Sequence, residues 1–308
     1  MPVLPSAFSP AVVSRVALAN AIANGVIVIT GGAVRLTGSG LGCPTWPRCT
    51  GSSLVPTREL AAHGVVEFTN RMLTFVLTVA AIAVVVVVFR SVRRDLRKLA
   101  VLSFLGIPAQ ALLGGVTVLT GLNPWTVAAH FLLSMVLVAV ATTLWLRSRE
   151  PGVGQPLLRR PFVLLVTGIA AVTAVVLALG TIVTGSGPHS GDPKAGRTGF
   201  DPELVSQLHA DVVFLLVGLT AALLVALYAI DSPGRVRRAA RDLLIAQLAQ
   251  GLVGYVQYFT NLPIVLVLVH MAGAVLITAF TARLIWSVRG PASELPFDSP
   301  AQAAPATR

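Results

Sequence analysis

Eight long apolar runs divide the chain, and they restrict it to one class of fold. Each is close to the roughly 20 residues that an α-helix needs to cross the hydrocarbon core of a bilayer. Of the 308 residues, 55% are hydrophobic and only 11% are charged, more apolar material than a soluble domain of this length buries. The sequence therefore predicts an all-α polytopic membrane protein with eight transmembrane helices, at about residues 15–35, 65–89, 99–119, 126–146, 162–184, 205–230, 242–259 and 264–286.

The basic residues indicate how these helices are oriented. They cluster in the connections after the second, fourth and sixth runs, whereas the alternate connections contain few of them. Because Lys and Arg concentrate on the cytoplasmic side, this asymmetry predicts cytoplasmic N- and C-termini in a protein of the cell (plasma) membrane. The net charge of +11 is thus an orientation signal and does not indicate nucleic-acid binding. The clusters are Arg90, Arg93, Arg94, Arg97 and Lys98; Arg147, Arg149, Arg159 and Arg160; and Arg235, Arg237, Arg238 and Arg241.

The first apolar run has some features of a signal peptide, since Arg15 precedes it and it contains the small residues Ala17 and Ala19. Its length, and its counterpart later in the chain, favour a retained helix. The stretch from Gly290 is rich in Pro and Ala and has no apolar periodicity, so we expect disorder there. The expected organisation is a cytoplasmic N-terminus (1–14), a four-helix bundle (15–146), a cytoplasmic linker (147–161), a second four-helix bundle (162–286) and a cytoplasmic tail (287–308).

Short motifs recur in the two halves of the chain. Thr37-Gly38-Ser39-Gly40 follows the first run, and Thr184-Gly185-Ser186-Gly187 follows the fifth. Gln110 precedes His130 by 20 residues (130 − 110), and Gln250 precedes His270 by the same 20 (270 − 250). With four spans per half, both halves enter the membrane in the same direction. We therefore expect two bundles related by a pseudo-two-fold axis along the membrane normal.

The repeat brings three histidines and one asparagine into register. His209 and His270 are 61 residues apart (270 − 209), and counting 60 back from His130 reaches Asn70. All four lie near the outward end of an even-numbered span. Two imidazoles at equal depth on facing helices suit a haem iron, whereas zinc would need further ligands. A proton relay and ordinary hydrogen-bonded histidines remain alternatives. Glycines that would admit a flat macrocycle, or serve helix packing, are Gly114, Gly115, Gly251 and Gly254.

Both cysteines of the chain lie in the first outward loop, in the sequence Cys43-Pro-Thr-Trp-Pro-Arg-Cys49. Two thiols this close outside the cytoplasm indicate a disulfide that closes a loop over a site. A metal site would have only His63 nearby as a further ligand. A more specific alternative is that the two cysteines form a redox-active pair.

Charged residues begin the second apolar run. Glu67 and Arg71 lie where a charge costs free energy in lipid, so each is expected to be paired, to face a cavity or to have a functional role. A simpler interpretation is an i,i+4 ion pair near the lipid headgroups.

Together, these motifs resemble the haem A synthase family over roughly residues 15–286. The resemblance rests on GGAVRLTGSGLGCPTWPRC (31–49), on Glu67-x-x-Asn70-Arg71, on TGSGPHSGDP (184–193) and on the histidines of the fourth, sixth and eighth spans. It implies an oxidoreductase that converts a methyl group of haem O to the formyl group of haem A, the prosthetic group of terminal oxidases. The candidate partners that it implies are haem O synthase and terminal-oxidase assembly factors, and the electron donor is not identified.

The resemblance also implies roles for individual residues. A haem b cofactor would lie in the C-terminal bundle with His209 and His270 as axial ligands. The substrate haem would lie in the N-terminal bundle, where His130 matches an axial ligand and Asn70 and Arg71 contribute to binding. Glu67 matches the family's essential glutamate and is the candidate catalytic residue. Cys43 and Cys49 match the family's loop cysteines.

One position departs from the family pattern, which is usually Glu-x-x-His-Arg, because this chain has Asn70 in place of the histidine. Asparagine is a poor iron ligand, so either His130 binds the substrate haem alone or another group such as His63 substitutes. His63 lies seven residues earlier, about 10 Å further out along a helix. A haem with one imidazole keeps an open position for oxygen chemistry. Two other classes remain: a dihaem b-type electron-transfer protein without chemistry of its own, and a transporter.

Overall fold

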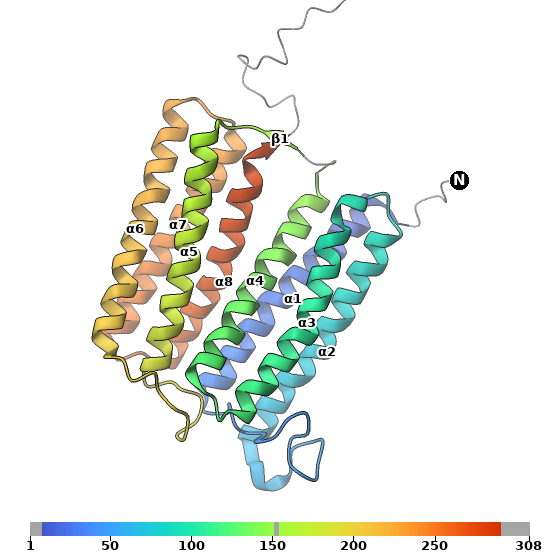
Figure 1. Cartoon of the computed structure of the whole chain (residues 1–308), viewed down its shortest axis with the longest axis vertical. Helices are drawn as coiled ribbons and strands as arrows, with labels where there is room; N and C mark the ends of the chain where they lie inside the picture. The colour runs from blue at the N-terminus through green and yellow to red at the C-terminus, as the bar shows by residue number, and fades with distance from the viewer. Residues whose placement is uncertain (1–7, 151–153, 291–308) are drawn as a thin grey trace, which may run out of the picture.

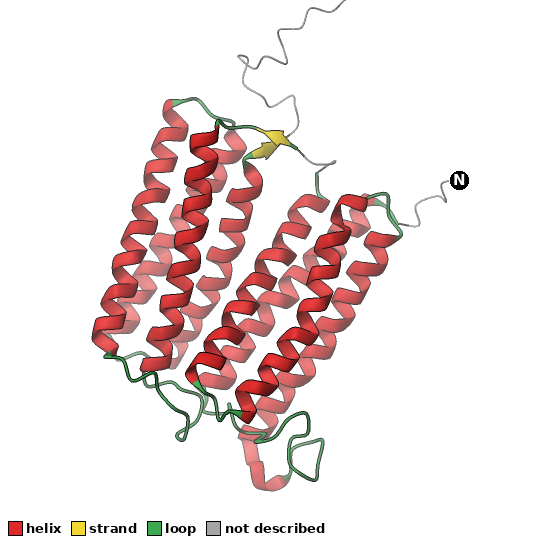
Figure 2. Cartoon of the chain, viewed as in Figure 1, coloured by secondary structure: helices red, strands yellow, loops and turns green. Residues whose placement is uncertain are grey.

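The structure, a computed structural model, describes residues 8–150 and 154–290 and is built almost entirely of long helices (Figure 2). Two 3₁₀ segments, η1 (Arg58–Leu60) and η2 (Arg94–Leu96), precede the second and third helices. The long helices are α1 (Pro10–Leu36), α2 (Ala61–Phe89), α3 (Arg97–Leu119), α4 (Pro124–Ser148), α5 (Arg160–Ser186), α6 (Pro202–Ala229), α7 (Gly234–Phe259) and α8 (Ile264–Ser287).

Local sequence explains where several of these helices begin. Asp201 caps α6, because its carboxylate accepts hydrogen bonds from the backbone N–H groups of Glu203 (2.8 Å) and Leu204 (3.1 Å). Pro202 follows as the first helical residue, where its missing N–H costs nothing. Asn123 caps α4 in the same way, with Pro124 next.

The ends of α3 and α7 use the same device. Leu122, with φ 58°, donates its N–H to the Thr117 carbonyl at 2.8 Å. Leu262, with φ 57°, donates to the Gln257 carbonyl at the same distance. The preceding residue also has positive φ in both turns, a conformation that terminates helices. The turn within the Gln110–His130 interval therefore has the same backbone conformation as the turn within the Gln250–His270 interval.

Seven of the eight long helices in the described residues are long and apolar enough to cross a membrane. The exception is α7, which begins with a basic segment and contains Gln247, Gln250 and Gln257. These polar residues lower its mean hydropathy although its 26 residues would span the bilayer. The prediction of a polytopic helical membrane protein is confirmed. The helix boundaries lie close to those expected, except that α7 begins at Gly234 and not at residue 242.

The long helices form two groups (Figure 1). In the first group α1 packs along α2 and α4, and α3 packs along α2 and α4. In the second, α5 packs along α6, α7 packs along α6 and α8, and α5 and α8 are in looser contact. Across the boundary α4 contacts α8, while α1 contacts α8 and α5 contacts α4.

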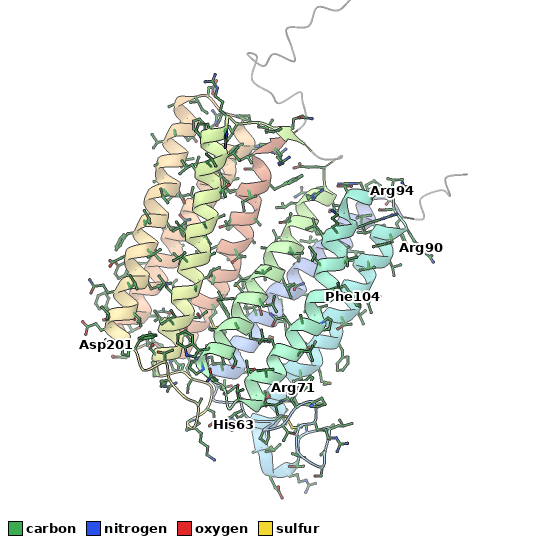
Figure 3. All side chains as sticks on the ribbon, viewed as in Figure 1. His63, Arg71, Arg90, Arg94, Phe104 and Asp201 are labelled. Atoms are coloured by element: carbon green, nitrogen blue, oxygen red, sulfur yellow. A yellow bond between two sulfur atoms is a disulfide. The ribbon has the colours of Figure 1, made fainter. Side chains whose placement is uncertain are left out.

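The two ends of the molecule differ in composition. One end carries the basic residues, including Arg90 and Arg94, and the other carries His63, Arg71 and Asp201 (Figure 3). We refer to these as the arginine end and the loop end, the latter containing residues 37–60 and 187–201. At the arginine end Arg93 and Arg147 pair with Asp95, and Arg235 pairs with Glu150.

The two largest hydrophobic clusters lie towards the arginine end of the groups. One joins α1 to α4 around Val13, Val84, Val88 and Leu144. The other fills the second group and includes Ile169, Leu223, Leu243 and Leu284. The second cluster extends towards His209, because Val176 packs against it and forms a backbone hydrogen bond with His209.

Connections at both ends join the two groups. At the loop end the Arg35 guanidinium donates to the carbonyls of His189 (2.7 Å) and Thr184 (3.2 Å). At the arginine end Glu150, which follows α4, accepts hydrogen bonds from Arg235 of α7 (2.7 Å) and from Trp286 Nε1 of α8 (3.0 Å). The two-residue strands β1 (Gln155–Pro156) and β2 (Arg289–Gly290) pair antiparallel beside the ends of α5 and α8, within the second group. These strands were not predicted, because two residues give no periodicity. The disorder expected from Gly290 is wrong for Gly290 itself, which lies in β2, and the rest of that stretch, 291–308, lies outside the described residues.

Candidate functional site

Three glycines on odd-numbered helices each face a histidine on the next helix. A Cβ atom added to Gly114 of α3 would lie 3.1 Å from Cε1 of His130 on α4. A Cβ added to Gly180 of α5 would lie 3.3 Å from Cε1 of His209 on α6, and one added to Gly254 of α7 would lie 3.3 Å from Cε1 of His270 on α8. The glycines thus permit the imidazoles to approach the neighbouring helix closely.

In the remaining pair of helices, α1 and α2, it is Asn70 that lies beside a glycine. A Cβ on Gly31 of α1 would lie 3.8 Å from Nδ2 of Asn70 on α2. Like the three histidines, Asn70 is half-buried, and its Oδ1 is buried with no hydrogen-bond partner among the described residues. The register inferred from the sequence therefore places Asn70 where the other pairs of helices have a histidine.

Sequence reasoning had noted Gly114 and Gly254 but missed Gly31 and Gly180. The repeat did not single them out, because they precede the two Thr-Gly-Ser-Gly motifs by different distances (37 − 31 = 6 and 184 − 180 = 4). Gly251, which was noted, has no atom within 4 Å of its added Cβ.

Equivalent hydrogen bonds hold the helices that carry His130 and His270. Gln110 Nε2 donates to the His130 carbonyl at 3.0 Å, and Gln250 Nε2 donates to the His270 carbonyl at 2.7 Å. Each bond fixes the helical turn that carries the histidine, in α4 and in α8 respectively. Because it uses the backbone carbonyl, it does not engage the imidazole ring. The Nδ1 atoms of both rings are buried without a hydrogen-bond partner among the described residues.

The residues of the second group fit a haem. His209 and His270 come from different helices, and their imidazoles are close enough to interact electrostatically. Each ring lies beside a glycine, and the Nδ1 atom of each is buried without a hydrogen-bond partner among the described residues. A backbone hydrogen bond also links His209 to Val176 of α5. No group of three or more His, Cys, Asp or Glu residues that could hold a metal ion occurs in the described part of the chain. Two imidazoles without further ligands suit a haem iron better than zinc.

Glu67 and Arg71 form the i,i+4 ion pair that the sequence suggested, and the pair also holds the cysteine loop. Arg71 Nε lies 3.1 Å from Glu67 Oε1, and Nη2 contacts the same oxygen. Arg71 also donates to the carbonyls of Cys43 (2.9 Å) and Thr45 (3.0 Å). Glu67 Oε2 accepts the Cys43 N–H at 2.6 Å. Both charges of this buried pair are thereby satisfied.

Cys43 and Cys49 form the expected disulfide, and both residues are buried. His63 does not extend towards Asn70, because its Nδ1 bonds to the Ser39 hydroxyl at 2.9 Å. Within the same loop, Trp46 lies against α3: a Cβ on Gly115 would be 2.5 Å from Cδ2 of its indole. This contact was not anticipated, although Trp46 stands between the two cysteines.

Residues 14–189 match the COX15-CtaA family, described as cytochrome oxidase assembly protein. The matched stretch is more than half of the 308 residues; it contains Glu67, Asn70 and His130 and ends before His209.

Curated relatives carry the name Heme A synthase. The protein of Listeria welshimeri is 34% identical over 117 residues, which are 37% of this chain and 38% of the relative. That of Lysinibacillus sphaericus is 34% identical over 123 residues, 39% of each chain. That of Bacillus pumilus is 35% identical over 116 residues, 36% of this chain and 37% of the relative. The aligned part of the chain thus spans less than two fifths of the length of the relatives it matches.

The resemblance to haem A synthases is therefore confirmed at the level of the family, and the chain belongs to the COX15-CtaA family of cytochrome oxidase assembly proteins.

Proposed function

We propose that the protein is a haem A synthase, a membrane oxidoreductase that converts haem O to haem A for terminal oxidases. The observation that carries this proposal is the position of the Glu67–Arg71 pair. It holds a disulfide-closed loop at the end of a helix group in which the imidazole of His130 lies beside Gly114 and Asn70 lies beside Gly31. Family membership and the names of the relatives point to the same activity. Nothing in the comparisons supports the alternative of a dihaem electron-transfer protein.

In this proposal the second helix group holds a haem b between His209 and His270. The glycines Gly180 and Gly254 support this assignment, because they leave the helix surfaces beside the two rings without side chains. When bound there, a bis-imidazole haem supplies one-electron transfer. The protein contributes the orientation of the rings, which for His270 is supported by the Gln250 bond to the same turn of α8.

The first group would bind the substrate, haem O. His130 supplies one axial ligand, and Asn70 leaves the other face without a protein ligand. Arg71 lies in the next turn of α2 from Glu67, and its guanidinium, paired with that carboxylate, would border this site. His63 is not proposed as a ligand, since Ser39 occupies its Nδ1.

The net change is R–CH₃ + H₂O + 2 A → R–CHO + 2 AH₂, where A is an external two-electron, two-proton acceptor, and the protons leave from the substrate methyl group and the water. Glu67 is the proposed group that accepts and passes on these protons, because its carboxylate is one helical turn from Asn70. The Cys43 N–H and Arg71 hold its two oxygens in place. The proposed catalytic carboxylate is therefore also part of the loop anchor.

The proposed topology has eight transmembrane helices, because α7 is counted as a crossing together with the other seven, and it places both termini in the cytoplasm of a plasma-membrane protein. The cross-boundary contacts support a pseudo-two-fold relation between residues 15–146 and 162–286, since α4 meets its counterpart α8, and α1–α8 is matched by α5–α4. Residues 1–14, 147–161 and 287–308 would then be cytoplasmic. Haem O synthase and oxidase assembly factors remain the proposed partners.

Haem analysis tests the activity directly. The full chain is expressed in a bacterial host that makes haem O but lacks haem A, and extracted haems are separated and weighed by mass spectrometry. We expect haem A with the unaltered chain and only haem O with an empty vector. Haem O alone in cells that contain the folded protein would contradict the proposed function.

A further inference from the structure

The side chain of Trp46, between the two cysteines, lies against α3 at a glycine. Gly115 of α3 provides the space: a Cβ there would lie 2.5 Å from Cδ2, 2.8 Å from Cε2 and 2.9 Å from Cε3 of the indole. These distances are too short for real atoms, so only glycine admits the ring in this position. The next residue towards the N-terminus of α3, Gly114, faces His130.

The chain on either side of the indole is fixed to α2. Arg71 holds the carbonyl of the preceding residue, Thr45, and that of Cys43, while Glu67 holds the Cys43 N–H. The disulfide to Cys49 closes the loop after the indole. The backbone around Trp46 is therefore held by Glu67 and Arg71, which flank Asn70 on α2. Its indole contacts Gly115 of α3, the neighbour of the glycine that faces His130.

We propose that Trp46 closes the loop end of the first helix group and controls access to the haem position between Asn70 and His130. This inference rests on the proposed function, because the indole would cover the site where haem O is proposed to bind. Asn70 would leave one coordination position of that haem without a protein ligand, and without a cover this position would bind water and small bases. An indole seated on Gly115 excludes them, and it positions the loop without contributing a catalytic group.

Gly115→Ala tests the contact between the indole and α3 without removing the indole. The added Cβ would displace Trp46, whereas Ala is well tolerated in a helix. Gly251→Ala on α7 is the matched control, because its added Cβ has no atom within 4 Å. Hydroxyl-radical footprinting with peptide mass analysis reports each Trp separately and needs no bound haem. We expect Trp46 to be protected in the unaltered chain relative to Trp125, which is 52% exposed, and to be oxidised several-fold faster in Gly115→Ala.

A second measurement follows access to the open position in the haem-loaded full chain. Stopped-flow mixing with imidazole converts a high-spin haem to a low-spin one, and the rate reports entry. We expect Trp46→Ala and Gly115→Ala to accelerate this conversion several-fold and Trp46→Phe to restore most of the slow rate. Trp125→Ala removes the same side chain from an exposed position at the loop end and should leave the rate unchanged.

The outcomes separate the two proposals. Faster imidazole entry in both variants of a protein that forms no haem A would retain the closing role and reject the synthase. Haem A formation with equal imidazole rates in all variants would reject the closing role and retain the synthase. If no haem loads in the first group, the footprint decides: Trp46 oxidised as fast as Trp125 in the unaltered chain overturns the proposal, and protection lost only in Gly115→Ala supports it.

Discussion

Glu67 Oε2 accepts a hydrogen bond of 2.6 Å from the backbone N–H of Cys43, which joins the proposed catalytic carboxylate to the disulfide loop. Glu67 is only 5% exposed and would be costly in this position without partners. The bond means that any change at Glu67 acts both on proton transfer and on the loop. The two effects need to be measured separately.

Glu67→Gln should abolish haem A formation while haem loading persists. A glutamine retains an oxygen that can accept the Cys43 N–H, so the loop keeps one anchor, but it cannot accept protons. Loss of a general base typically costs about 10² to 10⁴ in rate. Haem extraction with mass analysis measures product, and the optical spectrum of the purified protein measures loading.

Glu59→Gln is the control for this variant, since Glu59 is an exposed carboxylate of the same region, in η1. It should retain full product. Equal haem A from the Glu67→Gln protein would show that Glu67 serves only as a loop anchor.

Replacing the haem-ligating histidines of the second helix group should have a different effect on the haem spectrum from replacing the one in the first group. We expect His209→Ala or His270→Ala to remove the low-spin haem b spectrum, because each deletes one of the two imidazoles. His130→Ala should leave that spectrum intact and impair substrate binding. An unchanged bis-imidazole spectrum in His209→Ala would contradict the assignment of haem b to this group.

Gly254 should be required for the same haem. Val at this position places atoms where the His270 ring lies, since even a Cβ would be 3.3 Å from Cε1. Gly254→Val is expected to lower haem content or to alter the low-spin signal in electron paramagnetic resonance. Gly251→Val, one turn away on α7 and facing open space, gives the same change in helix propensity and should retain the normal signal.

The fold was largely predictable because membrane helices are specified by local features. Length, apolarity and arginine clusters defined the eight helices, and only α7 falls short on composition through its glutamines. The disulfide and the Glu67–Arg71 pair also followed from spacing. Contacts between distant segments did not: nothing in the sequence joins Trp46 to Gly115 or Arg35 to the His189 carbonyl. Such contacts depend on how the loops fold over the helix ends.

Opening the disulfide should loosen the loop and leave the helices intact. In the chain-entropy treatment, closing a loop this short stabilises by about 2 kcal/mol. With Cys43→Ser and Cys49→Ser together, Arg71 still holds two carbonyls, so we expect faster amide hydrogen exchange in residues 43–49 and lower haem A yield. Far-UV circular dichroism should be unchanged. A loss of helix signal would mean that the bridge supports the whole first group.

Asn70→His should convert the first helix group into a bis-imidazole site. Asn70 lies beside Gly31 as His130 lies beside Gly114, and its buried Oδ1 has no partner among the described residues. The added Cβ of Gly31 is 3.8 Å from Asn70, compared with 3.1 Å at His130, so there is room for the larger ring. A haem bound to the unaltered first group should be high-spin, with His130 as its one protein ligand, and the variant should shift it towards low-spin. Electron paramagnetic resonance of His209→Ala and of Asn70→His combined with His209→Ala isolates this haem from the one in the second group. Two bis-imidazole haems in the unaltered protein would show that another residue fills the place of Asn70, and that the register between the two halves has been misassigned.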